Sequence, residues 1–211
     1  MKRSIDEHAD RFSDHAADYD ESQDAPEYRE CADLVVAHAA PEADDVVLDL
    51  GTGTGAIAFP LAEQAAAVEG RDISDGMLAE ATAKATDESI DNVSFDEGRF
   101  REPNVEGDID IVTSNFAMHH LDDEAKREAI DVIAGLEPRR FVLGDVMLFG
   151  TEDESSVTFY DPEVDDPATV GVLADAFTDA GFALTAVEMV HEQVGVLVGE
   201  RLSETEDEAA E

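Results

Sequence analysis

The chain has 211 residues, 43% of them apolar, which is enough for one substantial hydrophobic core and favours a single domain. Its one cysteine, Cys31, excludes an internal disulfide, and no apolar signal or membrane-spanning segment follows Met1, so we expect a cytoplasmic protein with no membrane association. Asp and Glu number 53 against 13 Lys and Arg, and the formal charge of -40 excludes a broadly basic nucleic-acid-binding protein.

This acidity has two explanations, a disordered acidic chain or a folded protein whose charge repulsion is screened by concentrated salt. Periodic apolar segments run through most of the chain, so disorder fits only the ends. In molar salt the screening length falls to roughly 3 Å. The composition therefore favours the cytoplasm of an extreme halophile. The nearest basic candidates are the pairs Arg99/Arg101 and Arg139/Arg140, which do not form a stripe, so nucleic acid is disfavoured as a partner.

The N-terminal residues 1–41 are predicted to form a helical cap. A weak helical stripe runs through Ile5, Phe12, Ala16 and Tyr19, and a second helix is expected from Tyr28 to Ala40, where Pro41 ends it.

From Val46 onward, short apolar runs alternate with Ala-rich helical segments, which is typical of an α/β fold with a mostly parallel sheet covered on both faces. The expected strands are 46–50, 67–71, 93–95, 109–114 and 141–145, and the expected helices are 56–64, 75–86 and 123–135. Pro60 lies close enough to the start of the first helix to replace a first-turn donor.

The C-terminal part, 148–202, is predicted to lie on the substrate side. An irregular acidic stretch to about Ala168 precedes a helix at 169–180, and strands at 183–190 and 193–199 predict an antiparallel hairpin that completes seven strands. Residues 152–166 and the N-terminal segment are expected to flank the substrate entrance, with loop packing as the alternative role for Phe159 and Tyr160. The charged tail, 203–211, is predicted to be disordered.

A glycine turn, Asp49-Leu-Gly-Thr-Gly-Thr-Gly55, follows the first strand and opens the first helix of this region. Glycines there let a ligand approach the backbone at the carboxyl edge of the sheet, although a tight turn without a ligand is the alternative. Dinucleotide folds prefer G-x-G-x-x-G, whereas this chain has G-x-G-x-G preceded by Asp49. A carboxylate there would repel a diphosphate and suit a sulfonium and an ammonium group, which favours S-adenosylmethionine over NAD.

Asp72 ends the second predicted strand, 21 residues after Gly51 (72 − 51 = 21). An acid at that place can accept hydrogen bonds from both ribose hydroxyls of a nucleoside cofactor. The alternative is a solvated or helix-capping aspartate. Together with the glycine turn, we expect the ribose role.

Three segments resemble the class I S-adenosylmethionine-dependent methyltransferases, and among them the small YrrT-like bacterial enzymes: VLDLGTGTG at 47–55, DISDGMLAEA at 72–81 and SNFAMHHLDDEAKREAI at 114–130. The resemblance covers about residues 10–200 and implies a Rossmann-like fold with S-adenosylmethionine as the cofactor. We expect a single domain at 1–202 with a cofactor-binding core at 46–147. The residues expected to bind it are Asp49, Gly51, Thr52, Gly53, Gly55, Asp72, Ile73, Phe100 and Asn115.

One departure from the family lies after the third strand. The family usually has Gly-Asp there, with the aspartate accepting from the adenine amino group, whereas this chain has Gly98-Arg99. Arginine has no acceptor. Three alternatives remain. Asp96 or Glu97 supplies the missing acceptor for the adenine amino group, or backbone groups and Phe100 hold the adenine, or cofactor binding is weakened.

His119 and His120 follow the fourth strand and are the candidate catalytic residues, because a neutral imidazole can remove a proton from an acceptor. The alternative is that one caps a helix and the other packs in the core. The fourth strand is not followed by Asn/Asp-Pro-Pro-aromatic, so a small-molecule acceptor is favoured. No metal site is expected, and a homo-oligomer is possible. A non-catalytic partner subunit remains the second hypothesis, and a nicotinamide oxidoreductase the third.

Overall fold

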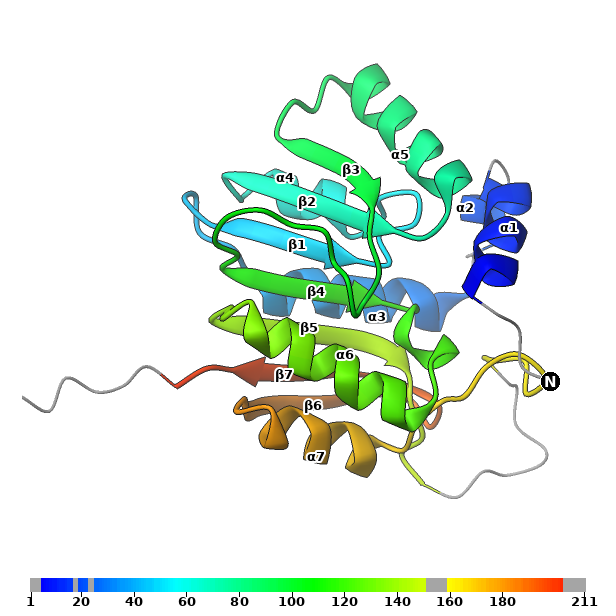
Figure 1. Cartoon of the computed structure of the whole chain (residues 1–211), viewed down its shortest axis with the longest axis vertical. Coiled ribbons are helices and arrows are strands. Elements are labelled where there is room, and N and C mark those ends of the chain that lie inside the picture. Colours follow the sequence, from blue (N-terminus) through cyan, green and yellow to red (C-terminus); the bar gives the residue numbers. More distant parts are fainter. Residues whose placement is uncertain (1–4, 17–18, 23–24, 151–158, 203–211) are drawn as a thin grey trace, which may run out of the picture.

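The computed structural model describes residues 5–16, 19–22, 25–150 and 159–202. The elements in chain order are α1 Ile5–His15, α2 Tyr19–Ser22, α3 Pro26–Ala39, β1 Val46–Leu50, α4 Ala58–Ala62, β2 Ala67–Asp72, α5 Asp75–Glu88, β3 Val93–Glu97, β4 Ile111–Asn115, the 3-10 turn η2 Met118–His120, α6 Asp123–Gly135, β5 Arg140–Val146, α7 Val170–Asp179, β6 Ala183–His191 and β7 Val194–Glu200 (Figure 1). In this part of the chain, no helix is both long and apolar enough to cross a membrane.

The described strands form one seven-stranded sheet in the order β3-β2-β1-β4-β5-β7-β6. The first five are parallel, and β7 pairs antiparallel with both β5 and β6. The predicted mostly parallel α/β sheet with an antiparallel C-terminal hairpin is therefore confirmed. The strand order reverses between β1 and β4, and open α/β sheets bind ligands at the carboxyl ends of the strands beside such a reversal.

The sheet is covered on both faces because its strand residues alternate in direction. Leu48 of β1 and Phe141 of β5 join a cluster with buried residues of α6 and α7. Val47 and Val142 face the other way and pack with buried residues of α3 and α4. Figure 1 shows α6 and α7 in front of the sheet and α3 behind it.

The N-terminal segment divides into two parts. Helices α1 and α2 lie beyond the arrowheads of the parallel strands (Figure 1), and α1 contacts α5. Gly76 permits this contact, because a Cβ there would lie 2.7 Å from Ser13 Cα. In contrast, α3 packs against β4, β5 and β7 and belongs to a sheet layer. The predicted cap at 1–41 thus includes a helix that is part of the core.

Two predicted elements extend two residues beyond the observed ones at an end. The helix expected at 56–64 is Ala58–Ala62, and the strand expected to begin at 109 begins at Ile111. Residues 56 and 57 continue the turn beyond Gly55 instead of starting the helix, and the backbone of Asp110 pairs with Val46 and Arg139 outside the β4 ladder. The tail at 203–211, predicted to be disordered, lies outside the described residues.

Candidate functional site

The glycine turn is held by hydrogen bonds between backbone atoms. The N–H groups of Gly51 and Thr52 donate to the carbonyl of Arg71 at 2.8 and 3.1 Å, which ties the end of β1 to the end of β2. Gly51 has a φ of 73° and Gly53 a φ of 55°, a backbone region that glycine enters without steric cost. A Cβ on Gly51 would lie 2.3 Å from Ala117 Cβ, so the turn approaches the loop after β4 closely.

Asp72 supports the same turn from the end of β2. Its Oδ2 accepts from the Gly53 N–H and its Oδ1 from the Ser74 N–H, each at 2.9 Å. Burial raises the pKa of Asp72, and the backbone donors oppose that effect. A carboxylate oxygen has two lone pairs, so each oxygen keeps capacity for one more donor. Asp72 can therefore position the turn and still bind two hydroxyl groups.

Asp49 lies within β1 and is buried. Its Oδ1 accepts from Thr113 Oγ1 on β4 at 2.8 Å. Burial raises the pKa of Asp49 to about 6, against the hydrogen bonds from Thr52 and Thr113 that favour the charged form. A cationic ligand at the turn above it would favour ionised Asp49, because opposite charges attract strongly where little water is present.

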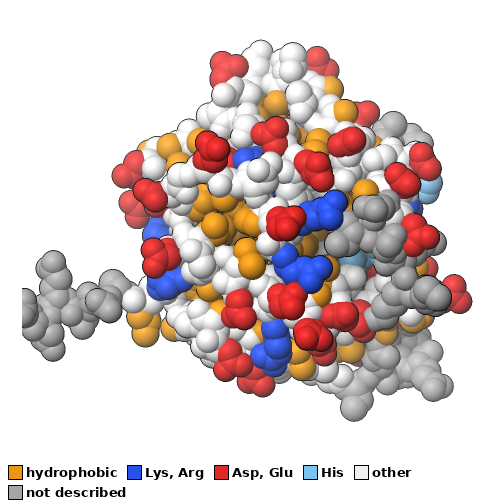
Figure 2. All heavy atoms as spheres, in the orientation of Figure 1, with side chains coloured by type: hydrophobic (Ala, Val, Ile, Leu, Met, Phe, Trp, Pro, Cys, Tyr) orange, Lys and Arg blue, Asp and Glu red, His pale blue; other side chains and the backbone are white. Residues whose placement is uncertain are grey.

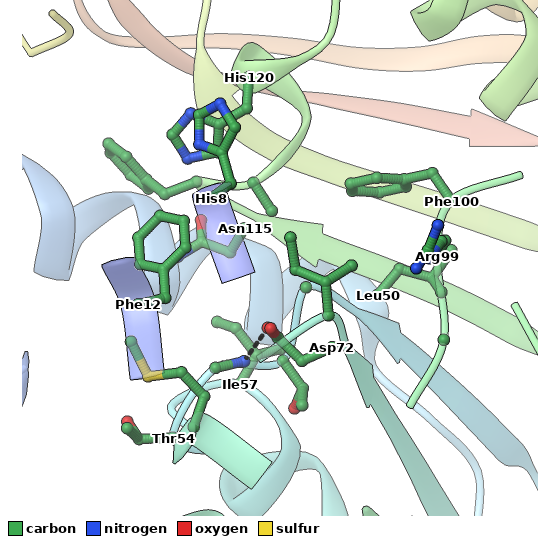
Figure 3. Close-up of a pocket in the computed structure, with 18 of the residues that line it drawn as sticks. His8, Phe12, Leu50, Thr54, Ile57, Asp72, Arg99, Phe100, Asn115 and His120 are labelled. Carbon is green, nitrogen blue, oxygen red and sulfur yellow. Dashed lines mark hydrogen bonds between the residues drawn. The ribbon is translucent and has the colours of Figure 1, made fainter. Parts of the chain in front are cut away.

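A cavity of about 490 Å³ opens in front of the turn, a size common for cofactor sites (~300–1,000 Å³). Of the residues predicted from the sequence, the structure brings eight to its lining: Gly51, Thr52, Gly53, Asp72, Ile73, Phe100, Asn115 and His120. Figure 3 shows Arg99 and Phe100 at one end, Asp72 between, and His8, Phe12 and His120 at the other end. We call this space the cofactor cavity.

Three predicted residues do not line the cofactor cavity, namely Asp49, Gly55 and His119. Asp49 lies behind the turn. Gly55, with a φ of 94°, makes room for the Phe59 ring, to which a Cβ would approach within 2.4 Å. Gly55 therefore serves helix packing in this structure.

The loop after β3 forms the end of the cavity near Phe100. Arg99 lines it, and its guanidinium lies 3.7 Å from the Glu97 carboxylate. Neither Asp96 nor Glu97 is among the lining residues, whereas Glu102 is. Glu102 is brought there because its backbone pairs with that of Arg99. The sequence offered no signal for Glu102, because this two-residue pairing follows no hydrophobic period.

The two histidines are each paired with a carboxylate from a distant segment. Nδ1 of His119 donates to Asp145 Oδ1 and Nδ1 of His120 to Asp165 Oδ1, both at 2.6 Å. The ring centroids of the histidines lie 4.0 Å apart. His120 packs against α1 as well, with its centroid 5.0 Å from that of His8. Neither Asp165 nor His8 was predicted as a partner of His120, since both lie far from it in the chain.

The N-terminal segment contacts the glycine turn and also lines the cofactor cavity. Asp20 of α2 accepts from Thr54 Oγ1 of the glycine turn at 2.6 Å and from Lys84 Nζ of α5 at 2.5 Å. Phe12 and Tyr19, members of the predicted helical stripe, line the cofactor cavity. Of the predicted substrate entrance at 152–166, residues up to 158 lie outside the described part, and Phe159 and Tyr160 line a second cavity.

The chain is similar to known methyltransferases in sequence. A family described as Methyltransferase domain matches residues 47–136. An uncharacterized methyltransferase of Oceanobacillus iheyensis is 30% identical over 154 residues, covering 70% of each chain. One of Geobacillus sp. (strain WCH70) is 36% identical over 130 residues, 60% of this chain, and the match spans only 57% of that relative's length.

The fold is similar to that of a solved structure, the complex of DhpI with S-adenosylhomocysteine. The TM-score is 0.72, the match covers 93% of this chain and 96% of DhpI, and 20% of the residues are identical. At this identity the likeness shows the fold alone, and it extends over the C-terminal hairpin as well as the parallel strands.

Proposed function

The chain belongs to the class I S-adenosylmethionine-dependent methyltransferase family, and we propose that it binds S-adenosylmethionine and transfers the methyl group to a small molecule. One observation carries the proposal: the glycine turn and Asp72 line one cavity that runs along the carboxyl edge of the sheet to His120. The bound S-adenosylhomocysteine of DhpI, which has the same fold, supports the choice of cofactor.

The lining residues fit this cofactor in their hydrogen-bonding groups. Asp72 retains acceptor capacity for the ribose hydroxyls beside Ile73. The side-chain amide Nδ2 of Asn115 is buried with no hydrogen-bond partner, and Asn115 lines the cavity. A buried donor without a partner is costly, so a polar ligand group there would be stabilising. The methionine part of the cofactor would thus lie between Asn115 and the turn at 51–53.

The adenine would lie at the end of the cavity that holds Phe100. An aromatic face can stack on a base, and Glu102 offers the acceptor that Arg99 lacks. We propose that Glu102 takes the place of the family's aspartate. The departure at Arg99 then changes the adenine contact without removing it.

S-adenosylmethionine supplies a methyl group already activated by its positive sulfonium, so alignment of the acceptor accounts for much of the acceleration. Well-oriented reactants gain ~7–11 kcal/mol from positioning. Helix α1, through His8 and Phe12, lines the end of the cavity near His120, where it would shield a bound ligand from water. His119 and His120 are the proposed groups for orienting or deprotonating an acceptor.

The acidic surface supports a halophilic setting for this activity. Figure 2 shows Asp and Glu side chains spread over the visible face, with fewer Lys and Arg side chains among them. At a formal charge of -40, like-charge repulsion opposes the folded state unless salt screens it. We propose that the protein acts in the salt-rich cytoplasm of a halophile and requires molar KCl for full stability.

Calorimetric titration of S-adenosylmethionine and S-adenosylhomocysteine in molar KCl tests the proposal. We expect Asp72→Asn to lose at least about tenfold in affinity, ~1.4 kcal/mol, because one of its two oxygens becomes a donor. Asp75→Asn, an exposed acid three residues away, is the matched control and should bind as the wild type does.

No binding by a folded wild-type protein would contradict the enzyme proposal. It would favour the second hypothesis, a methyltransferase-like partner subunit that does not catalyse the reaction, for which the loss of the family's aspartate at Arg99 is the motivating observation. Circular dichroism of the same sample establishes that the protein is folded.

A further inference from the structure

The second cavity, of about 640 Å³, is the feature from which the acceptor can be inferred. We call it the acceptor cavity. Its described lining contains six aromatic residues, Phe12, Tyr19, Tyr28, Phe116, Phe159 and Tyr160. The chain has 13 Phe and Tyr in total (10 + 3), and all three tyrosines are in this lining. Such a concentration of flat apolar side chains selects a flat, ring-containing ligand.

The acceptor cavity adjoins the end of the cofactor cavity that holds His120. Both are lined by His120, Phe12 and Phe116, together with Tyr19 and Tyr28. The ring centroids of Tyr28 and Phe116 lie 4.8 Å apart, so these side chains form one continuous wall. A ring held against this wall would place a substituent next to His120.

The two histidines differ in what they can do there. His119 lines the acceptor cavity but not the cofactor cavity, and Asp145 receives both its ring Nδ1–H and its backbone N–H, at 2.6 and 3.0 Å. His120 lines both cavities, and its Nδ1–H donates to Asp165. A neutral imidazole with its proton on Nδ1 has its lone pair on Nε2. Because His120 alone of the two lines both cavities, its Nε2 is the base placed where an acceptor would meet the cofactor.

Asp165 is fixed in place by its own neighbours. Its Oδ2 accepts from the Asp161 N–H at 2.7 Å. The next residue, Asp166, donates its N–H to the carbonyl of His119 at 2.8 Å and accepts from Nζ of the buried Lys126. Burial opposes ionisation of Asp165, but the hydrogen bonds from His120 and Asp161 outweigh it and lower the pKa of Asp165 to about 2. Asp165 thus remains a carboxylate that orients the ring.

Burial and the neighbouring histidines favour the neutral imidazole of His120. Burial lowers the pKa of His120 first, and His119 of η2 and His8 of α1 lower it further, while Asp165 of the β5–α7 connection opposes them. The charged side chains lining the acceptor cavity include Arg11 and the acids Asp14, Asp161 and Asp165. Three carboxylates against one arginine disfavour an anionic acceptor.

A metal ion is the other chemistry to consider, because ligand atoms of His119, His120 and Asp165 all lie within 4.8 Å of one another. As arranged, however, both oxygens of Asp165 accept hydrogen bonds and Nδ1 of each histidine donates one. A metal would compete with these bonds. The observed pairing favours proton transfer.

We propose that the acceptor cavity binds a neutral aromatic alcohol, a phenol-type ring hydroxyl, and that His120, positioned by Asp165, removes its proton during methyl transfer. A phenol holds its proton at neutral pH, with a pKa of about 10, so it needs a base, whereas a neutral amine or a carboxylate does not. The acceptor oxygen bonds to the methyl carbon, and the carbon–sulfur bond breaks with its electron pair left on sulfur. The hydroxyl proton passes to Nε2 of His120. S-adenosylhomocysteine and an aryl methyl ether are the products.

This inference rests on the proposed methyltransferase function, so the test begins with binding. The full chain in molar KCl is titrated with S-adenosylhomocysteine by calorimetry and then with 2-naphthol by naphthol fluorescence. We expect both to bind, and Phe116→Ala to weaken 2-naphthol at least tenfold. No binding of S-adenosylhomocysteine would overturn the proposed function itself. Binding of S-adenosylhomocysteine without binding of 2-naphthol would overturn only the aromatic acceptor.

Methyl transfer is then measured by mass spectrometry with four probes on the same ring: 2-naphthol, 2-naphthylamine, 2-naphthalenethiol and 2-naphthoate. We expect 2-naphthol to react fastest and His120→Gln to lower kcat at least 100-fold, with S-adenosylhomocysteine affinity unchanged within threefold. The matched control is His38→Gln, which changes a histidine paired with Glu188 at 2.5 Å outside both cavities. A preference for the amine or naphthoate, or an unchanged rate in His120→Gln, would overturn the proposal.

The pH profile of kcat separates positioning by Asp165 from a merely structural role. The wild type should lose activity as His120 is protonated on the acidic side. Removing the carboxylate in Asp165→Asn removes its support for the imidazolium, so the acidic limb should move to lower pH while kcat falls about tenfold. An acidic limb of the kcat profile that stays at the wild-type pH in Asp165→Asn would contradict this assignment. Activity that a chelator abolishes and a divalent metal restores would contradict it as well.

Discussion

Two regions of the cofactor cavity are built by different means: the glycine turn with Asp72, called the first end below, and the surroundings of His120, called the second end. At the glycine turn, backbone N–H groups and the Asp72 carboxylate make most of the contacts, and these come from the segment between β1 and the start of α5, while Asp20 of α2 adds one bond to Thr54. At the His120 end, side chains from α1, η2 and the β5–α7 connection meet. The first end therefore depends on backbone conformation, and the second on side-chain pairing across the fold.

Gly51→Ala should break the first end most severely. Its Cβ would overlap Ala117 Cβ at 2.3 Å in a backbone with φ of 73°. Overpacking and left-handed strain together predict a loss of about 2–5 kcal/mol in the free energy of unfolding. Thermal unfolding in molar KCl measures it, with S-adenosylmethionine affinity as the second readout.

The control for this variant is Gly107→Ala, where φ is 92° but no atom lies within 4 Å of the added Cβ. Only the left-handed strain remains there, so about 1–2 kcal/mol is expected, with unchanged affinity. Equal losses in the two variants would show that the close approach to Ala117 does not matter.

Asp145→Ala should damage the second end alone. It leaves the donors of His119, both ring and backbone, and the Val146 N–H without their acceptor in a buried region. A loss of about 2–4 kcal/mol in unfolding free energy is expected, because buried unpaired donors are costly. S-adenosylhomocysteine affinity should stay within threefold, as measured by calorimetry.

The matched variant Asp145→Asn keeps one carbonyl acceptor and should lose less. If Asp145→Ala instead removed cofactor binding from a folded protein, the two ends would not be independent.

Asp49→Asn should change how stability depends on pH. Burial raises the pKa of Asp49 from 3.8 to about 6, so between those values the folded protein holds this proton more tightly than the unfolded chain. Wild-type stability therefore falls relative to Asp49→Asn as pH rises through this window. By pH 7 the change reaches at most about 3 kcal/mol.

Thermal or urea unfolding at pH 4, 5, 6 and 7 provides this measurement, and Asp44→Asn, an exposed acid, provides the control. A difference between Asp49→Asn and the wild type that does not vary with pH would contradict the effect of burial.

Arg99→Asp is expected to have the smallest effect and a favourable one. It returns an acceptor to the end of the cavity that holds Phe100, and S-adenosylmethionine affinity should rise about fivefold, roughly 1 kcal/mol. Arg101→Asp makes the same charge change at another lining residue and should not raise affinity. If both variants bind S-adenosylmethionine with equal affinity, the overall electrostatic potential of the cavity determines the affinity, and the adenine contact does not.

The fold was largely predictable because its patterns are local. Strand 46–50 was predicted with its observed bounds, and the remaining strands to within two residues. The errors fall where irregular backbone replaces a regular element, as at residues 56–57 before α4 and at Asp110, which pairs outside the β4 ladder. The helix at 123–135 also begins as predicted, since Asp122 caps it by accepting from the Ala125 N–H.

The candidate site was predictable only in part. Spacing alone placed Gly51, Gly53 and Asp72 together, since a strand, a turn and a second strand return the chain to one edge of the sheet. It did not distinguish His119 from His120, although they are adjacent in the sequence. Their roles differ because one ring turns toward Asp145 and the other toward Asp165.

The sequence by itself determined the order of strands and helices, the position of the glycine turn and the acid that follows β2. These depend on hydrophobic period, glycine conformation and short loop lengths, which act between near neighbours in the chain. The tertiary structure alone decided that Asp165 holds His120, that α1 covers the cavity and that Glu102 reaches its lining. Those contacts join residues far apart in the chain or in an irregular loop, and their geometry follows from how the layers pack.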